Sequence, residues 1–188
     1  MSPLLRLTLL AGLAAFLTSC NTTTSPTASK PGAATYAKVQ KVRTTAYTHT
    51  EPGGPRNAIG RRLSGNGVRS AASDWSRFPL GTRFRLLGTN EQYIIDDYGG
   101  ALIGTSTIDL YKTSRAAMRQ WGVRHVEIEI TQWGCEKESL KVLKPRSRVR
   151  IVRKMIEGLQ KEAQAQRSRT AALGLINRRL TPAVPAEV

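Results

Sequence analysis

Histidine and cysteine are scarce in this sequence: the 188-residue chain has two of each. Metal centres and Cys/His catalytic sites depend on these side chains. Nothing around His49 or His125 marks a Cys/His site, and no group of Asp and His residues forms a metal-ligand set. We therefore predict no metal and no other cofactor.

The chain also lacks an apolar run long enough for a typical membrane span. Its first 20 residues hold Arg6, a short apolar run and the tetrapeptide "LTSC", which together predict a secretory signal. The tetrapeptide resembles the lipobox of bacterial lipoproteins. This resemblance implies cleavage before Cys20 and a lipid on its thiol, so we expect a protein that is anchored to a membrane without crossing it. The alternative is a plain signal peptide that contains a cysteine.

The residue after Cys20 bears on where the protein resides. Asn21 is not the usual retention signal for an inner membrane. The lipoprotein resemblance therefore favours the outer membrane of the cell envelope, facing the periplasm. With Cys20 lipidated, Cys135 is the one remaining thiol, and no internal disulfide is expected.

Acidic residues are outnumbered: 13 Asp and Glu face 29 Lys and Arg, for a net charge of +16. Residues 136–188 carry 13 basic and 5 acidic residues, whereas residues 44–135 carry 11 and 8. Such a basic tail indicates a polyanionic partner. Because export argues against nucleic acid, we expect anionic lipid or a wall polymer.

The amino-acid composition divides the rest of the chain into a tether, a folded domain and a C-terminal extension. Residues 21–38 are rich in Thr, Ser, Pro, Ala and Gly and predict a flexible tether. Residues 39–132 read as the folded domain, with strand patterns at 39–48, 81–88, 91–97, 106–111 and 124–130 and a helix pattern at 113–122. This content predicts a mainly β domain, and a small closed barrel suits its length because it leaves no sheet edge exposed.

Residues 133–188 read as a basic C-terminal extension, separate from that domain. Val149, Val152, Ile156 and Leu159 recur at helical spacing, which predicts a basic amphipathic helix after Pro145. The run "RVRIV" also alternates as a strand does, so the first turn stays ambiguous. The last residues, "LTPAVPAEV", are expected to be disordered.

The candidate catalytic residues lie in the stretch "DDYGGALIGTSTIDLY", residues 96–111. In a strand over "STIDLY", Asp109 lies on the opposite face from Ile108 and Leu110, beside a threonine and a tyrosine. The two glycines allow a tight turn that brings Asp97 toward Asp109. Two neighbouring carboxylates raise one another's proton affinity, so one of them can act as an acid. The alternative is that these aspartates only cap turns.

Four segments appear in the order found in the 3D domain, a family named for three aspartates: "TTAYT", "AASDWSRFPLGTRF", "DDYGGALIGTSTIDLY" and "WGVRHVEI". The resemblance covers about residues 42–130 and extends to the catalytic barrel of membrane-bound lytic transglycosylase A. It implies a small six-stranded double-psi β-barrel with one or two short helices.

The same resemblance implies cleavage of peptidoglycan between N-acetylmuramic acid and N-acetylglucosamine, with a 1,6-anhydro product. It places the general acid at Asp109, while Asp97 and Asp74 shape its proton affinity or bind substrate. The C6 hydroxyl of the sugar replaces water, so one acid suffices, unlike in two-carboxylate glycosidases. The residues predicted to bind substrate are Thr45, Tyr47, Tyr98, Gly99, Gly100 and Tyr111.

Departures from the family pattern affect the groove. Trp75 follows Asp74 where the family often has proline, Tyr98 stands in place of a threonine, and an Arg-rich segment, "NAIGRRLSGNG", follows the first strand. Two further hypotheses therefore stand beside the enzyme: a non-catalytic wall-binding module with the same groove, and a structural lipoprotein. An enzyme needs a partly buried Asp109 facing an open cleft near Asp97, whereas a binder needs only the cleft.

Overall fold

The computed structural model describes residues 38–180. The predicted signal peptide with Cys20, the predicted tether up to residue 37 and the last residues from 181 lie outside this range. In chain order the elements are β1 (Lys38–Tyr47), β2 (Val68–Ala72), β3 (Arg83–Leu86), β4 (Gln92–Asp97), the 3-10 helix η1 (Gly100–Leu102), β5 (Ile108–Tyr111), α1 (Arg115–Trp121), β6 (Arg124–Gln132), α2 (Glu136–Leu143), the 3-10 helix η2 (Lys144–Arg146) and α3 (Arg150–Leu180).

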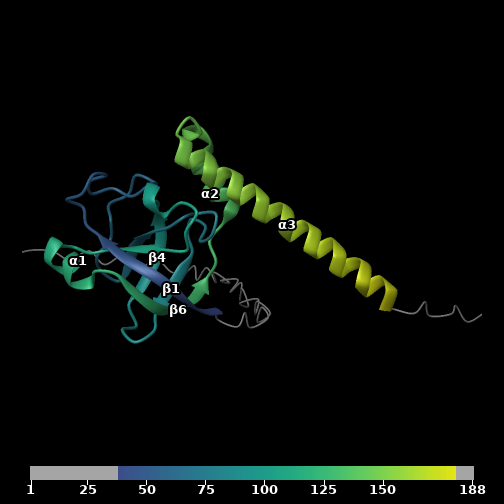
Figure 1. Cartoon of the computed structure of the whole chain (residues 1–188), viewed down its shortest axis with the longest axis horizontal. Helices are drawn as coiled ribbons and strands as arrows, with labels where there is room; N and C mark the ends of the chain where they lie inside the picture. The colour runs from purple at the N-terminus through teal and green to yellow at the C-terminus, as the bar shows by residue number, and fades with distance from the viewer. Residues whose placement is uncertain (1–37, 181–188) are drawn as a thin grey trace, which may run out of the picture. The chain divides into compact units, whose positions relative to one another are not determined.

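The six strands form a closed barrel in the order β1-β5-β2-β4-β3-β6 (Figure 1). β1 completes the ring, because it pairs in parallel with β5 and antiparallel with β6. The structure confirms the predicted mainly β fold with six strands in a closed barrel. The double-psi crossing of its connections stays a prediction.

Five of the strands and α1 lie where the sequence patterns predicted them. Ser114 caps α1 by accepting a hydrogen bond from the Ala117 backbone N–H, and Gly122 ends the helix with a φ of 60°. The strand that the patterns missed is β2, whose sequence is "VRSAA". Small residues are buried there in succession, so the strand shows no apolar alternation.

The barrel interior is built from alternate residues of several strands. Phe84 of β3 and Tyr93 of β4 stack with their ring centroids 5.5 Å apart. Ile128 and Ile130 of β6 face inward, as their alternation with Glu127 and Glu129 predicted. This fully buried core fixes the strand registers and with them the polar side chains at one end of the barrel.

The C-terminal extension is part of the same core, which corrects the predicted separation at residue 132. Leu143 of α2 and Val152, Met155 and Leu159 of α3 are all buried in one cluster with barrel residues. Backbone packing is close here: a Cβ on Gly158 would lie 2.6 Å from the Cβ of Ser76. The first half of α3 is therefore a structural element of the domain.

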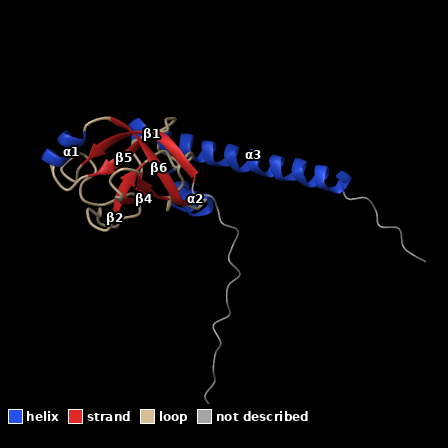
Figure 2. Ribbon diagram, turned by 90° about the horizontal axis from the view of Figure 1, so that it is seen from below, coloured by secondary structure: helices blue, strands red, loops and turns tan. Residues whose placement is uncertain are grey.

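The predicted tail helix is confirmed, with a different buried face and an additional helix before it. Val149 precedes α3 and is half exposed, whereas Met155 is fully buried. α2 was not predicted. Figure 2 shows α1 on one side of the strands and α3 on the other. Over residues 38–180, no helix combines the length and apolar character that a membrane crossing needs.

Candidate active site

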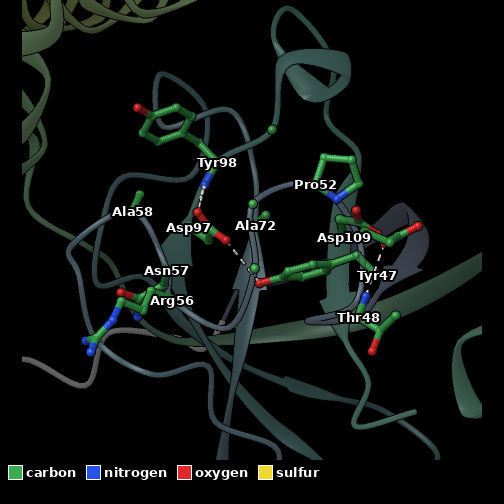
Figure 3. Close-up of a pocket in the computed structure, with 14 residues that line it drawn as sticks. Tyr47, Thr48, Pro52, Arg56, Asn57, Ala58, Ala72, Asp97, Tyr98 and Asp109 are labelled. Carbon is green, nitrogen blue, oxygen red and sulfur yellow. Dashed lines mark hydrogen bonds between the residues drawn. The ribbon is translucent and has the colours of Figure 1, made fainter. Parts of the chain in front are cut away.

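Two of the predicted aspartates occupy one level of the barrel wall. Asp109 of β5 pairs with Thr45 of β1 on one side and with Ala72 of β2 on the other. Ala72 also pairs with Asp97 of β4, so the two carboxylates flank a strand that presents only a methyl group between them (Figure 3). Two strand spacings separate their backbones, about 10 Å.

A β-bulge decides which aspartate of "DD" takes this place. The pairing of β2 with β4 shifts between Ala71 and Ala72, from Ile95 to Asp97, and leaves Asp96 unpaired. A bulge of this kind adds one residue to the strand and so changes the face to which the next side chain points. Asp97 therefore faces the same side as Asp109, and Asp96 turns into the protein.

Asp97 and Asp109 open into a cavity of about 500 Å³. Its wall consists of the barrel end and the loop that follows β1. The lining residues are Tyr47, Thr48, Glu51, Pro52, Gly53, Gly54, Arg56, Asn57, Ala58, Ala72, Asp97, Tyr98, Gly99 and Asp109. Sequence reasoning treated the loop from 51 to 58 as a Gly/Pro-rich connection and assigned no site residue there.

One oxygen of the Asp109 carboxyl accepts a hydrogen bond, and the other accepts none from the described residues. The Thr45 hydroxyl donates a hydrogen bond to Asp109 Oδ1 at 2.6 Å, and no other donor to this carboxyl lies within the described residues. Burial raises the pKa of Asp109 above the usual range. The Thr45 hydrogen bond opposes this rise, the negative charge of Glu51 adds to it, and Arg43 opposes it. Asp109 therefore binds a proton more readily than an exposed aspartate does.

Asp97 is held as a carboxylate by several donors. Its Oδ1 accepts from the Tyr98 backbone N–H at 2.9 Å, and its Oδ2 accepts from the Tyr47 hydroxyl at 3.3 Å (Figure 3). Burial nevertheless raises the pKa of Asp97 to about 6, with a further contribution from the charge of Asp96. Its ionised form therefore predominates at neutral pH.

These surroundings correct the predicted reason for proton retention by Asp109. The sequence analysis expected a glycine turn to bring Asp97 beside Asp109 and to raise its pKa. Instead β2 lies between the two strands, and the groups that set the pKa of Asp109 are its burial, Thr45, Glu51 and Arg43. Gly99 has an ordinary extended φ of −130°, so it makes no left-handed turn.

Tyr47 connects the two sides of the site. It comes from β1, and its phenol reaches Asp97 on β4 (Figure 3). Burial, followed by the charges of Asp97, Asp96 and Asp109, raises the pKa of Tyr47 far above its usual value. The hydroxyl therefore keeps its proton at neutral pH and acts as a hydrogen-bond donor.

Asp96 supports the cavity from behind. It is 8% exposed, and its Oδ2 accepts hydrogen bonds from Asn57 Nδ2 and from the Ser70 hydroxyl, both at 2.8 Å. Asn57 in turn lines the cavity and accepts from the Arg61 backbone N–H. Asp96 Oδ1 is buried without a partner among residues 38–180, and burial raises the pKa of this carboxyl.

Asp74, the third predicted aspartate, is not brought to the cavity. It is 2% exposed, and its Oδ1 accepts from the backbone N–H and the hydroxyl of Ser76. Its Oδ2 accepts from the backbone N–H of Gly104 at 2.7 Å, where φ is 84°. These contacts tie the loop after β2 to the loop before β5, which is the turn-capping arrangement that the sequence analysis kept as an alternative.

The residues predicted to bind substrate divide into two groups. Tyr47, Tyr98 and Gly99 line the cavity, whereas Thr45 acts through its hydrogen bond to Asp109. The Tyr98 ring points away from the two carboxylates and packs edge-on against Trp75, with centroids 5.2 Å apart (Figure 3).

Gly100 and Tyr111 lie outside the cavity lining. A Cβ on Gly100 would lie 3.5 Å from Ile151 of α3, an ordinary van der Waals contact, so this glycine faces the helix and not the cavity. Tyr111 is buried, and its hydroxyl is 2.9 Å from His49 Nδ1. No group of three or more His, Cys, Asp or Glu side chains in the described part of the chain is arranged to hold a metal ion.

Comparison with known proteins bears on this arrangement. Residues 69–135 match the model of the 3D domain family, a range that runs from the second residue of β2 past the end of β6 and includes all of the aspartates above. No curated protein matches the chain.

Proposed function

We propose that this protein is a lytic transglycosylase of peptidoglycan, starting from the match of residues 69–135 to the 3D domain family. The 3D domain is found in cell-wall-active proteins, which fits a role on peptidoglycan. The bond we assign to it joins N-acetylmuramic acid to N-acetylglucosamine. The single observation that carries the proposal is the pair Asp97 and Asp109, differently hydrogen-bonded and facing one open cavity.

The contrast in hydrogen bonding assigns the two roles. A carboxylate that accepts several hydrogen bonds is stabilised in its ionised form, whereas a buried one with few donors favours its proton. Asp97 accepts from Tyr98 and Tyr47, and Asp109 accepts only from Thr45. Burial raises the pKa of both carboxyls, so the assignment rests on geometry: Asp109, with one oxygen free of protein donors beside the cavity, is the general acid, and Asp97 supplies negative charge.

The reaction balances with Asp109 alone as proton donor and acceptor. Its carboxyl proton passes to the glycosidic oxygen as the bond from that oxygen to C1 of N-acetylmuramic acid breaks. The C6 hydroxyl of the same sugar then forms a bond to C1 and gives its proton back to Asp109. The product is a 1,6-anhydro ring, no water is consumed, and the carboxyl returns to its starting state.

Asp97 acts on the charge that develops during this step. Cleavage of the glycosidic bond leaves C1 and the ring oxygen positively charged in the transition state. The Asp97 carboxylate, on the other side of Ala72 and facing the same cavity, would stabilise that charge. Fixed charges in a partly buried site stabilise such a transition state without first having to reorganise.

The anchor and the basic helix complete the proposal. Lipid on Cys20 would hold the enzyme on the outer membrane facing the periplasm, and the tether would let the barrel reach the wall. Basic side chains on the exposed surface of α3, among them Arg150, Arg153 and Lys154, would add attraction to anionic lipid or wall polymer.

The deciding experiment is digestion of purified wall sacculi with the full chain, followed by mass analysis of the released fragments. We expect fragments that end in 1,6-anhydro-N-acetylmuramic acid. Fragments with ordinary reducing ends would indicate hydrolysis by water instead. Binding to sacculi without any release would favour the non-catalytic wall-binding module.

A further inference from the structure

A second pocket lies at the other end of β1 from the candidate active site. It has a volume of about 660 Å³ and is bounded by β1, the loop after β2, the segment after β6 and both long helices of the C-terminal extension. The side chains that matter here are Lys38, Arg77, Trp133, Glu136, Glu162 and Gln166. Nothing in the proposed reaction uses this pocket.

Trp133 gives the pocket its chemical character. Its side chain is 45% exposed, whereas Trp75 is fully buried. One face of the Trp133 ring lies against Phe78, with the two rings nearly parallel at 8° and their centroids 6.3 Å apart. This is offset stacking, which fixes the orientation of the indole. The remainder of the indole is open to the pocket.

The backbone beside Trp133 is held tightly. Gly134 donates its N–H to Thr82 Oγ1 at 3.0 Å, and Cys135 donates to the Leu80 carbonyl at 3.0 Å. A Cβ on Gly134 would lie 2.3 Å from the carbonyl oxygen of Pro79, so no other residue fits this position without a shift of the backbone. The exposed indole is therefore presented by a rigid support, which lowers the entropic cost of binding.

The polar groups around the indole carry no net charge. Lys38 and Arg77 contribute two positive charges, and Glu136 and Glu162 contribute two negative charges. Donors and acceptors are thus both present, together with the Gln166 amide and two serine hydroxyls. A phosphate or a strongly anionic polymer would meet the two glutamates, so this set favours an uncharged ligand with many hydroxyl groups.

We propose that this pocket binds an uncharged N-acetylated sugar, with the open part of the Trp133 indole as its platform. A sugar ring has an apolar face of C–H groups that packs on an aromatic ring, and its hydroxyls reach polar side chains at the rim. The inference rests on the proposed function only for the source of the sugar, which is the glycan strand of the wall.

The position of the pocket defines what it does for the enzyme. Lys38 and Tyr47, at the two ends of β1, line different sites, and a strand of this length spans about 30 Å. A long glycan strand reaches both sites, whereas a short oligosaccharide occupies one at a time. Binding at Trp133 thus raises the local concentration of polymer at the cavity without entering the chemical step.

The test uses the full chain with a tetramer of N-acetylglucosamine as the probe and the free stem peptide of the wall as a second arm. We expect the tetramer, and not the peptide, to protect tryptophan emission from quenching by acrylamide.

Trp133→Phe should abolish this protection, while calorimetry should still detect binding of the tetramer. Trp133→Ala should raise the Kd for the tetramer by about tenfold or more. Val123→Ala, a similarly exposed apolar residue beside β6, serves as the matched control.

A kinetic measurement separates this role from a structural one. Trp133→Ala should raise KM for sacculi while kcat for a short muropeptide substrate and the melting temperature stay unchanged. The inference is overturned if the wild type does not bind the tetramer, if Trp133→Ala binds it equally well, or if only the peptide protects Trp133. Binding of the tetramer at Trp133 by a protein that never cleaves sacculi would support this inference and overturn only the proposed function.

Discussion

Asp97 and Asp109 lie on strands that are not neighbours, yet both pair with the same residue of the strand between them. That residue, Ala72, presents only a methyl group, and the Tyr47 side chain reaches from β1 past this position to Asp97 (Figure 3). The two carboxyls are therefore separated by a strand and do not share one proton directly. Each has its own set of hydrogen-bond donors, so we expect substitution of each aspartate to have a different effect.

Asp109→Asn should abolish the release of anhydro-ended fragments from sacculi. An amide cannot donate the proton that the glycosidic oxygen needs, and loss of such acid catalysis typically lowers kcat by a hundredfold to ten-thousandfold. Burial disfavours the ionised form of Asp109, so the neutral amide should leave the melting temperature at pH 7 unchanged or higher. Retention of wild-type activity would exclude Asp109 as the acid.

Asp97→Asn should change both the pH profile and the stability. Wild-type activity should fall as the pH drops through about 6, because protonation removes the negative charge of Asp97, and the variant should lack this acid limb. Activity at neutral pH should decrease less than in Asp109→Asn. An unchanged acid limb in the variant would show that another group titrates there.

The stability effect of Asp97 has a definite sign. Its folded pKa of about 6 exceeds the ordinary value of 3.8, so the folded state is relatively stabilised below pH 4 and loses this stabilisation as pH rises through 6. Asp97→Asn should therefore raise the free energy of unfolding at pH 7.5, by at most roughly 3 kcal/mol, and not at pH 4. Denaturant titrations at the two pH values measure the difference.

Asp74→Ala should lower stability and leave the chemistry of the folded enzyme intact. The substitution removes the acceptors for Ser76 and for the buried backbone N–H of Gly104. An unsatisfied buried donor costs about 1–3 kcal/mol. Thermal melts should move down, while kcat at a temperature at which the variant is folded stays near wild type. A large loss of kcat with an unchanged melt would place Asp74 in the reaction after all.

Met155→Ala should destabilise the barrel although it lies in the C-terminal helix. Met155 is fully buried in the common core, and truncation of such a side chain typically costs about 2–5 kcal/mol. Leu173→Ala is the matched control, because Leu173 is 62% exposed on the same helix. A chain that ends after residue 135 should fail to unfold cooperatively; a sharp melt for that chain would mean that the barrel folds without α3.

Cys20→Ser should release the protein from membranes, because the serine hydroxyl does not accept the lipid that the lipobox resemblance implies. Fractionation in high salt measures this, since salt screens attraction by the basic helix and leaves a lipid anchor in place. A variant that still sediments with membranes in high salt would disprove lipid anchoring.

Much of the fold was predictable, because the local sequence patterns and the packing of the core favour the same elements. The alternation in β6 and the caps of α1 both specify the elements that form. By contrast β2 has no such pattern, since its small residues are buried by neighbours on both sides. Tail residues such as Met155 could not be assigned to the core, because a basic amphipathic helix looks the same whether its apolar face meets a barrel or a membrane.

The sequence predicted some of the residues that line the cavity but not their geometry. The sequence pattern singled out Asp109 and Asp97, and the structure brings both to one cavity. The bulge at Asp96 and the strand that separates the two acids depend on long-range pairing, which the local sequence does not encode. Glu51 gave no signal, because a single acidic residue in a Gly/Pro-rich loop is indistinguishable from a solvated one.

The pairing of β1 with β5 and β6 determines when this protein can fold. As the chain emerges N-terminus first, β1 finds its strand partners only after residues 108–132 have appeared, and Leu159 must follow before the core is complete. Contacts between such distant segments slow folding. The core therefore cannot be completed until the chain has been extended at least to Leu159.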